Sequence, residues 1–244
     1  MSYSLAGKVA LVTGANRGIG KAIVDAFFDN GVAKVYLAVR NPESTQELQQ
    51  KYGDKVVALP VDVTDDASVK ALAEQTRDVE VLVNNAGIMN LVSPLSGDAE
   101  SALQQEFNVN VFGLLRTAQA FAPILEANKG ALIQLNSIAS IKTFGDMTTY
   151  CASKAAAYSV TQGLREKLGE KGVSVLSVHP GPIATDMGKN AGFDEAPGAE
   201  TVAAGIVDAL KAGDFHLFPD PMAKQLEAAY QSYADDIILG EMSV

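Results

Sequence analysis

A tyrosine and a lysine four residues apart form the centre of the chemistry that this sequence supports. Residues 136–154 read as the end of a buried strand, a loop and the first turn of a helix. On a helix, Tyr150 and Lys154 project from one face and can meet above it. Ser137 follows the apolar run 131–135, which places its hydroxyl just past the carboxyl end of a strand, where open α/β sheets bind ligands.

These three side chains suit proton transfer to a carbonyl oxygen. A phenol has an ordinary pKa near ~10, and a neighbouring ammonium lowers that pKa by favouring the phenolate. With Lys154 as the ammonium, Tyr150 would protonate a ketone oxygen while hydride reaches the carbon, or deprotonate an alcohol in reverse. Ser137 would hold the oxygen in place. The alternative is three ordinary helix and loop residues, since Tyr-x-x-x-Lys alone is a common pattern.

A glycine-rich loop lies upstream, between an expected strand and an expected helix. The apolar run 9–12 leads into Thr-Gly-Ala-Asn-Arg-Gly-Ile-Gly at 13–20, and a helical pattern follows over 21–29. Glycines let the backbone approach a pyrophosphate, and a helix N-terminus offers unpaired N–H groups and partial positive charge. A tight strand-to-helix turn without a ligand is the alternative. The residues expected to contact a dinucleotide are Gly14, Asn16, Arg17, Gly18, Ile19 and Gly20.

The end of the second expected strand indicates which nicotinamide cofactor the loop would take. About 20 residues past the glycines, an acidic residue accepts the ribose hydroxyls of NAD, whereas an arginine accommodates the 2'-phosphate of NADP. Arg40 occupies that position, and Arg17 would contact the same phosphate from the loop. We therefore predict NADP(H) as the cofactor, the alternative being that both arginines are solvated surface residues.

Further motifs give the chain a family resemblance. Asn-Asn-Ala-Gly at 84–87 ends the fourth expected strand, Asn110 begins an Asn-Val-x-Gly pattern, and a Pro-Gly turn follows the strand expected over 173–178. Together with the glycine loop, spaced Gly-x-x-x-Gly-x-Gly, and the Ser-Tyr-Lys set, they resemble the short-chain dehydrogenase/reductase family in its short single-domain form. The resemblance covers about residues 8–221.

The resemblance implies roles that spacing alone does not assign. It makes Asn110 a fourth catalytic residue, which holds a water that connects Lys154 to solvent; a buried structural amide is the alternative. It places Asp62 and Val63 against the adenine ring, although Asp62 or Thr64 would also suit the cap of the following helix. It has Asn84 brace the central sheet. The remaining cofactor contacts that it implies are Asn84, Ala86, Gly87, Tyr150, Lys154, Pro180, Gly181, Ile183 and Thr185.

Short apolar runs that alternate with helical patterns predict the fold. This alternation indicates a parallel sheet covered by helices on both faces. We predict a single-domain doubly wound (Rossmann) α/β fold of about seven strands over residues 1–244, with a substrate lid at about 185–199. A chain of 244 residues has no comfortable room for a second domain. The seven runs are 9–12, 35–39, 56–59, 81–83, 131–135, 173–178 and 215–218.

The composition and charge of the chain exclude several classes of binding partner. A formal net charge of -10 disfavours a nucleic acid. No apolar run approaches the ~20 residues of a membrane span, and residues 1–7 lack the features of a secretory signal. We therefore expect a cytoplasmic protein with no membrane partner. Cys151 has no second cysteine to pair with, and His179 and His216 lie too far apart in the sequence to suggest zinc, so we expect no metal site.

The residues expected beside the substrate are mostly apolar, so we predict a small neutral ketone or aldehyde, or the matching alcohol. Small residues along the helix after Lys154 predict close helix packing, which by the resemblance forms the interface of a homodimer or homotetramer. The apolar tail 237–239 would pack on a neighbouring subunit or on the lid. The expected substrate-pocket residues are Met89, Ile138, Ala139, Phe144, Met147, Met187 and Phe193.

Two alternatives stay open beside an NADP(H)-dependent carbonyl reductase or alcohol dehydrogenase. A 3-oxoacyl thioester reductase would need a basic patch near the site entrance for a phosphorylated carrier, and the sequence shows none clearly. A non-catalytic NADP(H)-sensing regulator would keep the fold and the cofactor site. Such a regulator has no need of the catalytic set. The four candidate catalytic residues, Asn110, Ser137, Tyr150 and Lys154, therefore favour an enzyme.

Overall fold

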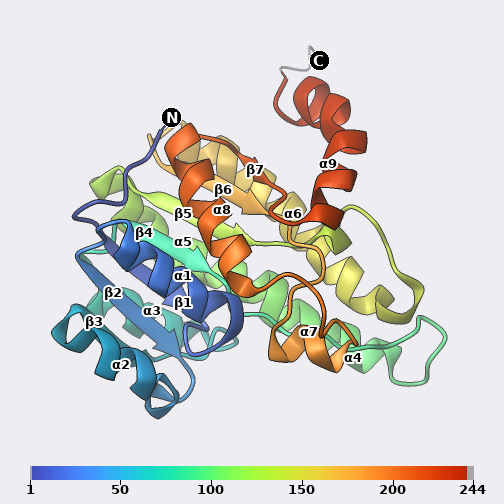
Figure 1. The fold of residues 1–244 in the computed structure, drawn as a ribbon, viewed down its shortest axis with the longest axis horizontal. Coiled ribbons are helices and arrows are strands. Elements are labelled where there is room, and N and C mark those ends of the chain that lie inside the picture. Colours follow the sequence, from blue (N-terminus) through green and yellow to red (C-terminus); the bar gives the residue numbers. More distant parts are fainter. Residues whose placement is uncertain (1, 241–244) are drawn as a thin grey trace.

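Seven parallel strands form the central sheet of the computed structural model, which describes residues 2–240 (Figure 1). Their order is β3-β2-β1-β4-β5-β6-β7. The order reverses between β1 and β4, and ligands of such sheets bind outside the carboxyl ends of strands at this point. The strands are β1 (Val9–Thr13), β2 (Lys34–Val39), β3 (Val56–Pro60), β4 (Val81–Asn84), β5 (Ala131–Leu135), β6 (Ser174–Val178) and β7 (His216–Leu217).

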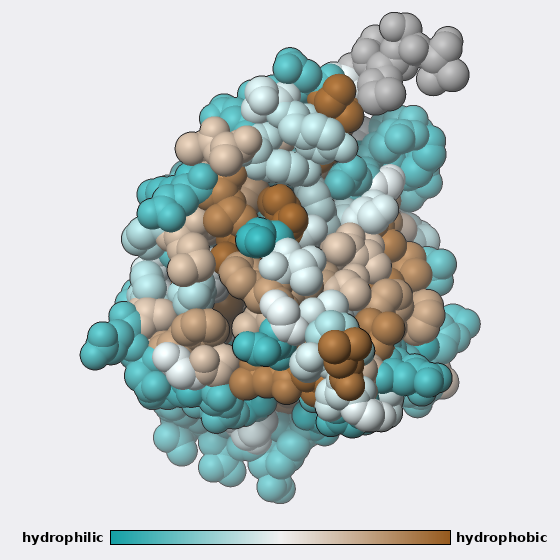
Figure 2. All heavy atoms as spheres, turned by 90° about the vertical axis from the view of Figure 1, so that its right-hand side faces the viewer, coloured by the Kyte–Doolittle hydropathy of each residue, from teal (hydrophilic) through white to brown (hydrophobic). Residues whose placement is uncertain are grey.

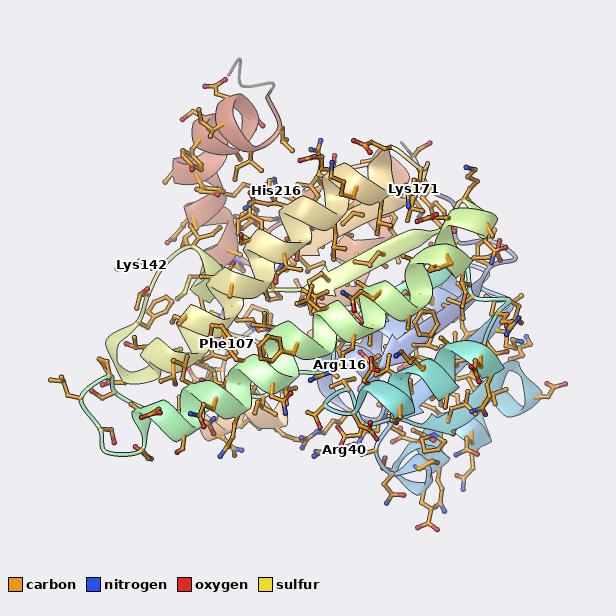
Figure 3. All side chains as sticks on the ribbon, turned by 180° about the vertical axis from the view of Figure 1, so that it is seen from behind. Arg40, Phe107, Arg116, Lys142, Lys171 and His216 are labelled. Carbon is orange, nitrogen blue, oxygen red and sulfur yellow. The ribbon has the colours of Figure 1, made fainter. Side chains whose placement is uncertain are left out.

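Helices cover both faces of the sheet. Side chains alternate along each strand, so Ala10 and Val12 of β1 pack in one core cluster and Leu11 packs in the other. The doubly wound α/β architecture predicted from the sequence is therefore confirmed. One face carries α1 (Gly18–Asp29), α2 (Gln46–Tyr52) and α8 (Ala199–Ala212), and the other, shown from behind in Figure 3, carries α3 (Asp66–Gln75), α5 (Gly113–Asn128) and α6 (Thr148–Gly169).

The helical region over residues 99–128 consists of three consecutive pieces. α4 (Ala99–Glu106) passes into a π-helical segment, Phe107–Phe112, before α5 begins. A π segment shifts the backbone hydrogen bonds to residues five apart, and such segments occur often at functional sites. The remaining helices are α7 (Asp186–Asn190) and α9 (Pro221–Tyr233), followed by a π-helical turn at Ala234–Ile238, and 3-10 turns occupy Pro42–Thr45, Gly53–Lys55, Ile138–Ser140 and Gly145–Met147.

The C-terminal apolar tail packs in part on its own chain. Ile238 contacts the core cluster beneath α5 and α6, whereas Ile237 is 43% exposed and Leu239 is 36% exposed. Ile238 therefore packs on its own core, and packing of the tail on a neighbouring subunit stays a prediction. Residues 241–244, which end this tail, lie outside the described part of the chain. Within residues 2–240, none of the helices combines the length and apolarity that a membrane crossing requires.

We predict that Gly130→Ala destabilises the sheet where β5 begins. A Cβ at Gly130 would lie 2.3 Å from the carbonyl oxygen of Glu80, which already accepts the N–H of Ala131 at 2.8 Å. Relief of this clash must move one strand, so the free energy of unfolding should fall by ~1–3 kcal/mol in urea denaturation. Gly97→Ala, whose Cβ meets no atom within 4 Å, is the control and should change it by less than ~0.5 kcal/mol. Equal stability of the two variants would contradict the described spacing of β4 and β5.

Candidate active site

A cleft of about 730 Å³ lies outside the carboxyl ends of β1 and β4. It extends from Arg40, which follows β2, across the glycine loop at 14–19 to Tyr150 and Lys154 on α6. Figure 2 views the molecule from the side of α4 and α7 and shows a hollow flanked by apolar residues. The cleft therefore joins the predicted cofactor loop to the predicted catalytic pair.

The glycine loop has the features of a pyrophosphate site. Gly14 and Gly18 adopt positive φ angles of 66° and 52°. The N-cap residue Arg17 is extended and makes no side-chain cap, and the first turn of α1 contains no acidic residue. The N–H groups of this turn are therefore not satisfied by a side chain and suit an anion. The observed loop thus fits a dinucleotide.

Gly20 has a packing role and does not line the cleft. A Cβ on Gly20 would lie 2.3 Å from the Gly14 carbonyl oxygen and 2.6 Å from Asn85 Nδ2. Asn85 in turn donates to the carbonyl oxygens of Thr13 at 2.9 Å and Gly14 at 3.2 Å. The third glycine lets α1 approach the loop, and Asn85 holds the loop in shape.

Two arginines lie at the end of the cleft near β2. Arg40 and Arg17 are exposed lining residues, and Arg17 Nη1 lies 3.4 Å from Asp186 Oδ2 of α7. The hydrogen bonds from Thr64 lower the pKa of Asp62, and the positive charges of Arg40 and Arg116 add to this effect (Figure 3). Two guanidinium groups therefore lie at this end of the cleft beside the carboxylates of Asp62 and Asp186, and guanidinium groups are suitable partners for a phosphate.

Asp62 and Val63 both line the cleft after β3. Asp62 Oδ1 accepts hydrogen bonds from the Thr64 N–H at 2.9 Å and the Thr64 hydroxyl at 2.7 Å. The cap of α3 comes instead from Asp65, which accepts the Ala67 N–H at 2.9 Å. The suggestion that Asp62 caps this helix is therefore wrong, and Asp62 shapes the turn that presents Val63.

Tyr150 and Lys154 come together in a buried part of the cleft. Their exposed fractions are 9% and 6%, and Lys154 Nζ lies 5.8 Å from the centroid of the Tyr150 ring. The ammonium donates a hydrogen bond of 2.7 Å to the carbonyl oxygen of Leu135 at the end of β5. Burial lowers the pKa of Lys154 to about 8, which leaves the ammonium mostly charged at neutral pH.

Burial raises the pKa of Tyr150 above its ordinary value. A hydrogen bond with Ser137 counteracts the rise, whereas the acidic groups of Cys151 and Glu106 add to it. The direction is opposite to the lowering expected from Lys154. The reason is that the ammonium is hydrogen-bonded to Leu135 and that removal from water penalises the phenolate more than the distant charge favours it.

Ser137 lies directly after β5, beside the turn at Pro180. Its hydroxyl oxygen accepts the Ala139 N–H at 3.1 Å and its proton is directed to the Pro180 carbonyl oxygen at 3.3 Å. Behind it, the buried His179 ring contacts the Ser140 and Ser177 hydroxyls at 3.0 and 2.7 Å. Burial lowers the pKa of His179 to about 3. His179 is therefore a neutral brace behind Ser137, a role that the sequence did not suggest.

Asn110 is a buried amide with three hydrogen bonds. Its Nδ2 donates to the Ile88 carbonyl oxygen and to Ser153 Oγ, both at 2.9 Å, and its Oδ1 accepts the Ile88 N–H at 3.0 Å. A Cβ on Gly87 would lie 3.2 Å from Asn110 Oδ1 and 3.8 Å from Lys154 Nζ. Asn110 thus ties the segment after β4 to α6, close to the Lys154 ammonium, as the structural alternative for this residue requires.

The other predicted cofactor residues divide into two groups. Ala86, Gly87, Pro180 and Thr185 line the cleft together with the predicted Asn16 and Ile19. Three do not line it: Asn84 is buried within β4, Ile183 is 5% exposed, and the Gly181 N–H donates to Asp220 Oδ2 at 2.6 Å. Asp220 also caps α9, so it joins the Pro-Gly turn to that helix.

The residues that were expected to line the substrate pocket lie in different parts of the structure. Met89, Phe144 and Met147 pack around the buried cluster of Ala139, Tyr150 and Cys151, beside the Tyr150 phenol. Ile138 packs instead with Phe218 and Ala223 towards α9. Met187 is 38% exposed and lines the cleft, while Phe193 closes a turn by donating its N–H to Gly188.

Several residues that line the cleft were not predicted from the sequence, because their residue types do not by themselves indicate a binding site. Most follow a strand end, and that position was the available clue. They are Ala38, Val39, Asn41, Ser44, Val61, Thr64, Asn85, Ile88, Val109, Leu135, Asn136 and Asp186.

We predict that Lys154 makes the stability of the cofactor-free protein depend on pH in the alkaline range. The unfolded chain keeps the Lys154 proton up to its ordinary pKa of 10.5, whereas the folded protein releases it at about 8. Folding therefore becomes more favourable as pH rises through this window, by up to ~3 kcal/mol relative to Lys154→Met. Urea denaturation of both proteins at several pH values measures the difference, and parallel pH profiles would contradict the lowered pKa.

Comparison with known proteins agrees with this geometry. A model of the short chain dehydrogenase family matches residues 8–196. An uncharacterized oxidoreductase of Staphylococcus aureus (strain USA300) is 40% identical over 187 residues, which cover 74% of this chain and 80% of that protein. A short chain dehydrogenase from Burkholderia cenocepacia J2315, solved in complex with NADP, is 33% identical with a TM-score of 0.86 over 96% of this chain and 98% of that one.

A short chain dehydrogenase/reductase from Burkholderia phymatum, solved in complex with NAD, shares the fold at 24% identity. Its TM-score is 0.84, and the match covers 99% of this chain and 100% of that one. The family model alone spans more than half of the chain. The chain therefore belongs to the short-chain dehydrogenase family of nicotinamide-dependent oxidoreductases.

Proposed function

We propose that the protein is an NADP(H)-dependent carbonyl reductase or alcohol dehydrogenase. The observation that carries this proposal is the buried pair of Tyr150 and Lys154 at one end of a cleft whose other end carries Arg40. One end suits proton transfer and the other suits a phosphate. The distance between them is spanned by a loop that fits a pyrophosphate, so a phosphorylated dinucleotide matches the whole cleft.

Three features support NADP(H) over NAD(H). Arg40 stands where an acidic residue would accept the ribose hydroxyls of NAD, and Ser44 adds a hydroxyl to the same part of the cleft lining. Arg17 lies on the other side of this end and faces Asp186. The relative from Burkholderia cenocepacia was solved with NADP. A 2'-phosphate would find two guanidinium groups here.

The chain's own residues supply the proton for carbonyl reduction. Bound NADPH supplies a hydride to the carbonyl carbon. Tyr150 gives its phenolic proton to the carbonyl oxygen, so that a C–H and an O–H bond form and the C=O double bond becomes single. The raised pKa of Tyr150 keeps the phenol protonated before the reaction. Ser137 turns its hydroxyl from Pro180 to the substrate oxygen and holds it.

Lys154 stabilises the phenolate that remains. Its ammonium also lies near the backbone of Gly87, where it would bind the nicotinamide ribose. Both amide protons of Asn110 are occupied by Ile88 and Ser153, so a water that returns the proton to Lys154 must use an Asn110 oxygen. The second lone pair of Oδ1 and the backbone carbonyl within the π-helical segment are suitable acceptors.

The segment 185–199 serves as the lid in this proposal. Thr185 caps α7 by accepting the Gly188 N–H at 3.2 Å, and Arg17 and Asp186 bridge the lid and the glycine loop. Closing would exclude water from the cleft.

The protein acts as a homodimer or homotetramer in the cytoplasm, with α5 and α6 at a subunit interface.

The substrate is a small neutral ketone or aldehyde. Met89, Phe144 and Met147 form an apolar wall beside Tyr150, and none of them offers a charge to a carboxylate or a phosphate. Lys142, in the segment between β5 and α6 (Figure 3), is exposed. An apolar wall favours neutral carbonyl compounds over acidic ones because burial of an unpaired charge is costly.

Consumption of NADPH with a panel of neutral ketones, diketones, aldehydes and an acetoacetyl thioester tests the function. Tyr150→Phe should lower kcat at least ~100-fold because the proton donor is lost. Tyr233→Phe, at a residue 54% exposed, should keep wild-type activity. Turnover of the thioester alone would move the assignment to a 3-oxoacyl thioester reductase. Tight NADPH binding without turnover of any compound would favour a regulator that senses NADP(H).

We predict that Arg40→Asp reverses the cofactor preference. The substitution removes one guanidinium and adds a carboxylate that repels the 2'-phosphate and accepts ribose hydroxyls. The Kd for NADPH, measured by nucleotide fluorescence, should rise at least ~10-fold while that for NADH changes far less. Arg77→Asp makes the same charge change at an exposed residue outside the cleft lining and should leave both values unchanged. Equal weakening of both nucleotides would remove the argument from Arg40.

A further inference from the structure

A carboxyl group is buried beneath the segment that borders the substrate side of the cleft. Glu106 is the last residue of α4, next to Phe107, which Figure 3 labels, and its exposed fraction is 0%. Its Oε1 accepts the Asn90 N–H at 2.7 Å. This hydrogen bond fixes the peptide that joins Met89 to Asn90, in the long segment between β4 and α4.

Three polar atoms around this carboxyl are buried without a hydrogen-bond partner among the described residues. They are Glu106 Oε2, Asn90 Nδ2 and Thr149 Oγ1, and they come from α4, from the segment after β4 and from the first turn of α6. Burial raises the pKa of Glu106, and the side chains of Thr149 and Asn90 counteract this rise. The Thr149 and Asn90 side chains therefore face the Glu106 carboxyl and favour its charged form.

The cluster lies between two parts of the proposed reaction site. Thr149 immediately precedes Tyr150, and Met89 immediately precedes Asn90. The Met89 side chain packs against the buried cluster that contains Tyr150. One carboxyl group therefore reaches both the start of the catalytic helix and the peptide that carries the apolar wall.

We propose that Glu106 is a positioning residue that holds the Met89 wall at a fixed distance from the Tyr150 hydroxyl, and thereby determines how tightly a carbonyl substrate is held. This inference rests on the proposed function of Tyr150 as the proton donor to a carbonyl compound. Glu106 does not line the cleft, so it acts through Asn90 and Thr149. Glu106 thus affects the specificity for the carbonyl substrate and takes no part in proton transfer.

Variants of Glu106 separate this role from a general structural one. Glu106→Gln keeps the shape and an oxygen acceptor for the Asn90 N–H, whereas Glu106→Leu keeps the volume and removes the acceptor. We expect Glu106→Leu to raise the KM for the carbonyl substrate at least 10-fold, with kcat lowered less than KM is raised and the Kd for NADPH within 2-fold of wild type. Glu106→Gln should restore KM to within 3-fold. Glu100→Leu, at an exposed glutamate of the same helix, is the matched control.

An unchanged KM in Glu106→Leu would overturn the inference. Parallel losses in KM, kcat and NADPH affinity would also overturn it, because they would indicate a general structural role. If Glu106→Leu does not fold, Thr149→Val takes its place, since it removes the hydroxyl beside the carboxyl and keeps the side-chain shape. The KM should then rise 3-fold or more, and wild-type KM would overturn the inference.

Hydrogen exchange tests the positioning without any substrate. In full-length protein with NADPH bound, Glu106→Leu should speed amide exchange in residues 88–98 at least 10-fold and leave β4 and α5 unchanged. Unchanged exchange in 88–98 would overturn the inference. If the wild type turns over no compound of the panel, the proposed function fails, and this exchange measurement alone decides whether Glu106 holds the segment.

Discussion

The buried ammonium of Lys154 is the constraint on which the rest of the site depends. The Lys154 side chain is almost completely buried, and its ammonium donates a hydrogen bond of 2.7 Å to the carbonyl oxygen of Leu135. That oxygen is available because β5 ends there, at the edge where all the parallel strands end. The sheet thus supplies the acceptor, α6 supplies the ammonium, and the same helix places Tyr150 one turn earlier. A site of this kind needs the sheet edge and the helix in fixed relation.

Several distant segments maintain that relation through buried hydrogen bonds. Asn110 joins the segment after β4 to α6, His179 braces the turn that carries Ser137, and Asp220 joins the Pro-Gly turn to α9. Such groups are costly to bury unless they are paired. Around the cleft these groups are paired, so they hold the segments that border it in a fixed arrangement.

The sequence predicted the parts of this structure that depend on local pattern. The seven apolar runs match the seven strands to within two residues at each end, because buried parallel strands leave continuous apolar segments. Tyr150 and Lys154 were placed together because helix geometry fixes residues four apart. The glycine loop was predicted from its glycine spacing between an expected strand and an expected helix, and the positive φ angles of Gly14 and Gly18 are ones that glycine adopts readily.

Features that depend on long-range packing were not predicted. The π-helical segment around Asn110 and the unpaired cluster at Glu106 arise from contacts between segments that are distant in sequence. The direction of the Tyr150 pKa also depends on burial, which spacing does not reveal. Sequence places Lys154 beside Tyr150, but only the fold shows that the ammonium is bound to Leu135 and that removal from water dominates.

A direct measurement of the Tyr150 ionisation tests the central claim, which is that burial keeps this phenol protonated in the folded protein and so ready to donate its proton to a carbonyl oxygen. Ultraviolet absorbance titration of the wild type minus Tyr150→Phe isolates one of the seven tyrosines. The free protein should show Tyr150 ionising above its ordinary pKa of 10.0, and saturation with NADP+ should lower that pKa, because the oxidised nicotinamide ring carries a positive charge. An ordinary or lowered pKa in the free protein, or no change on binding, would contradict the account.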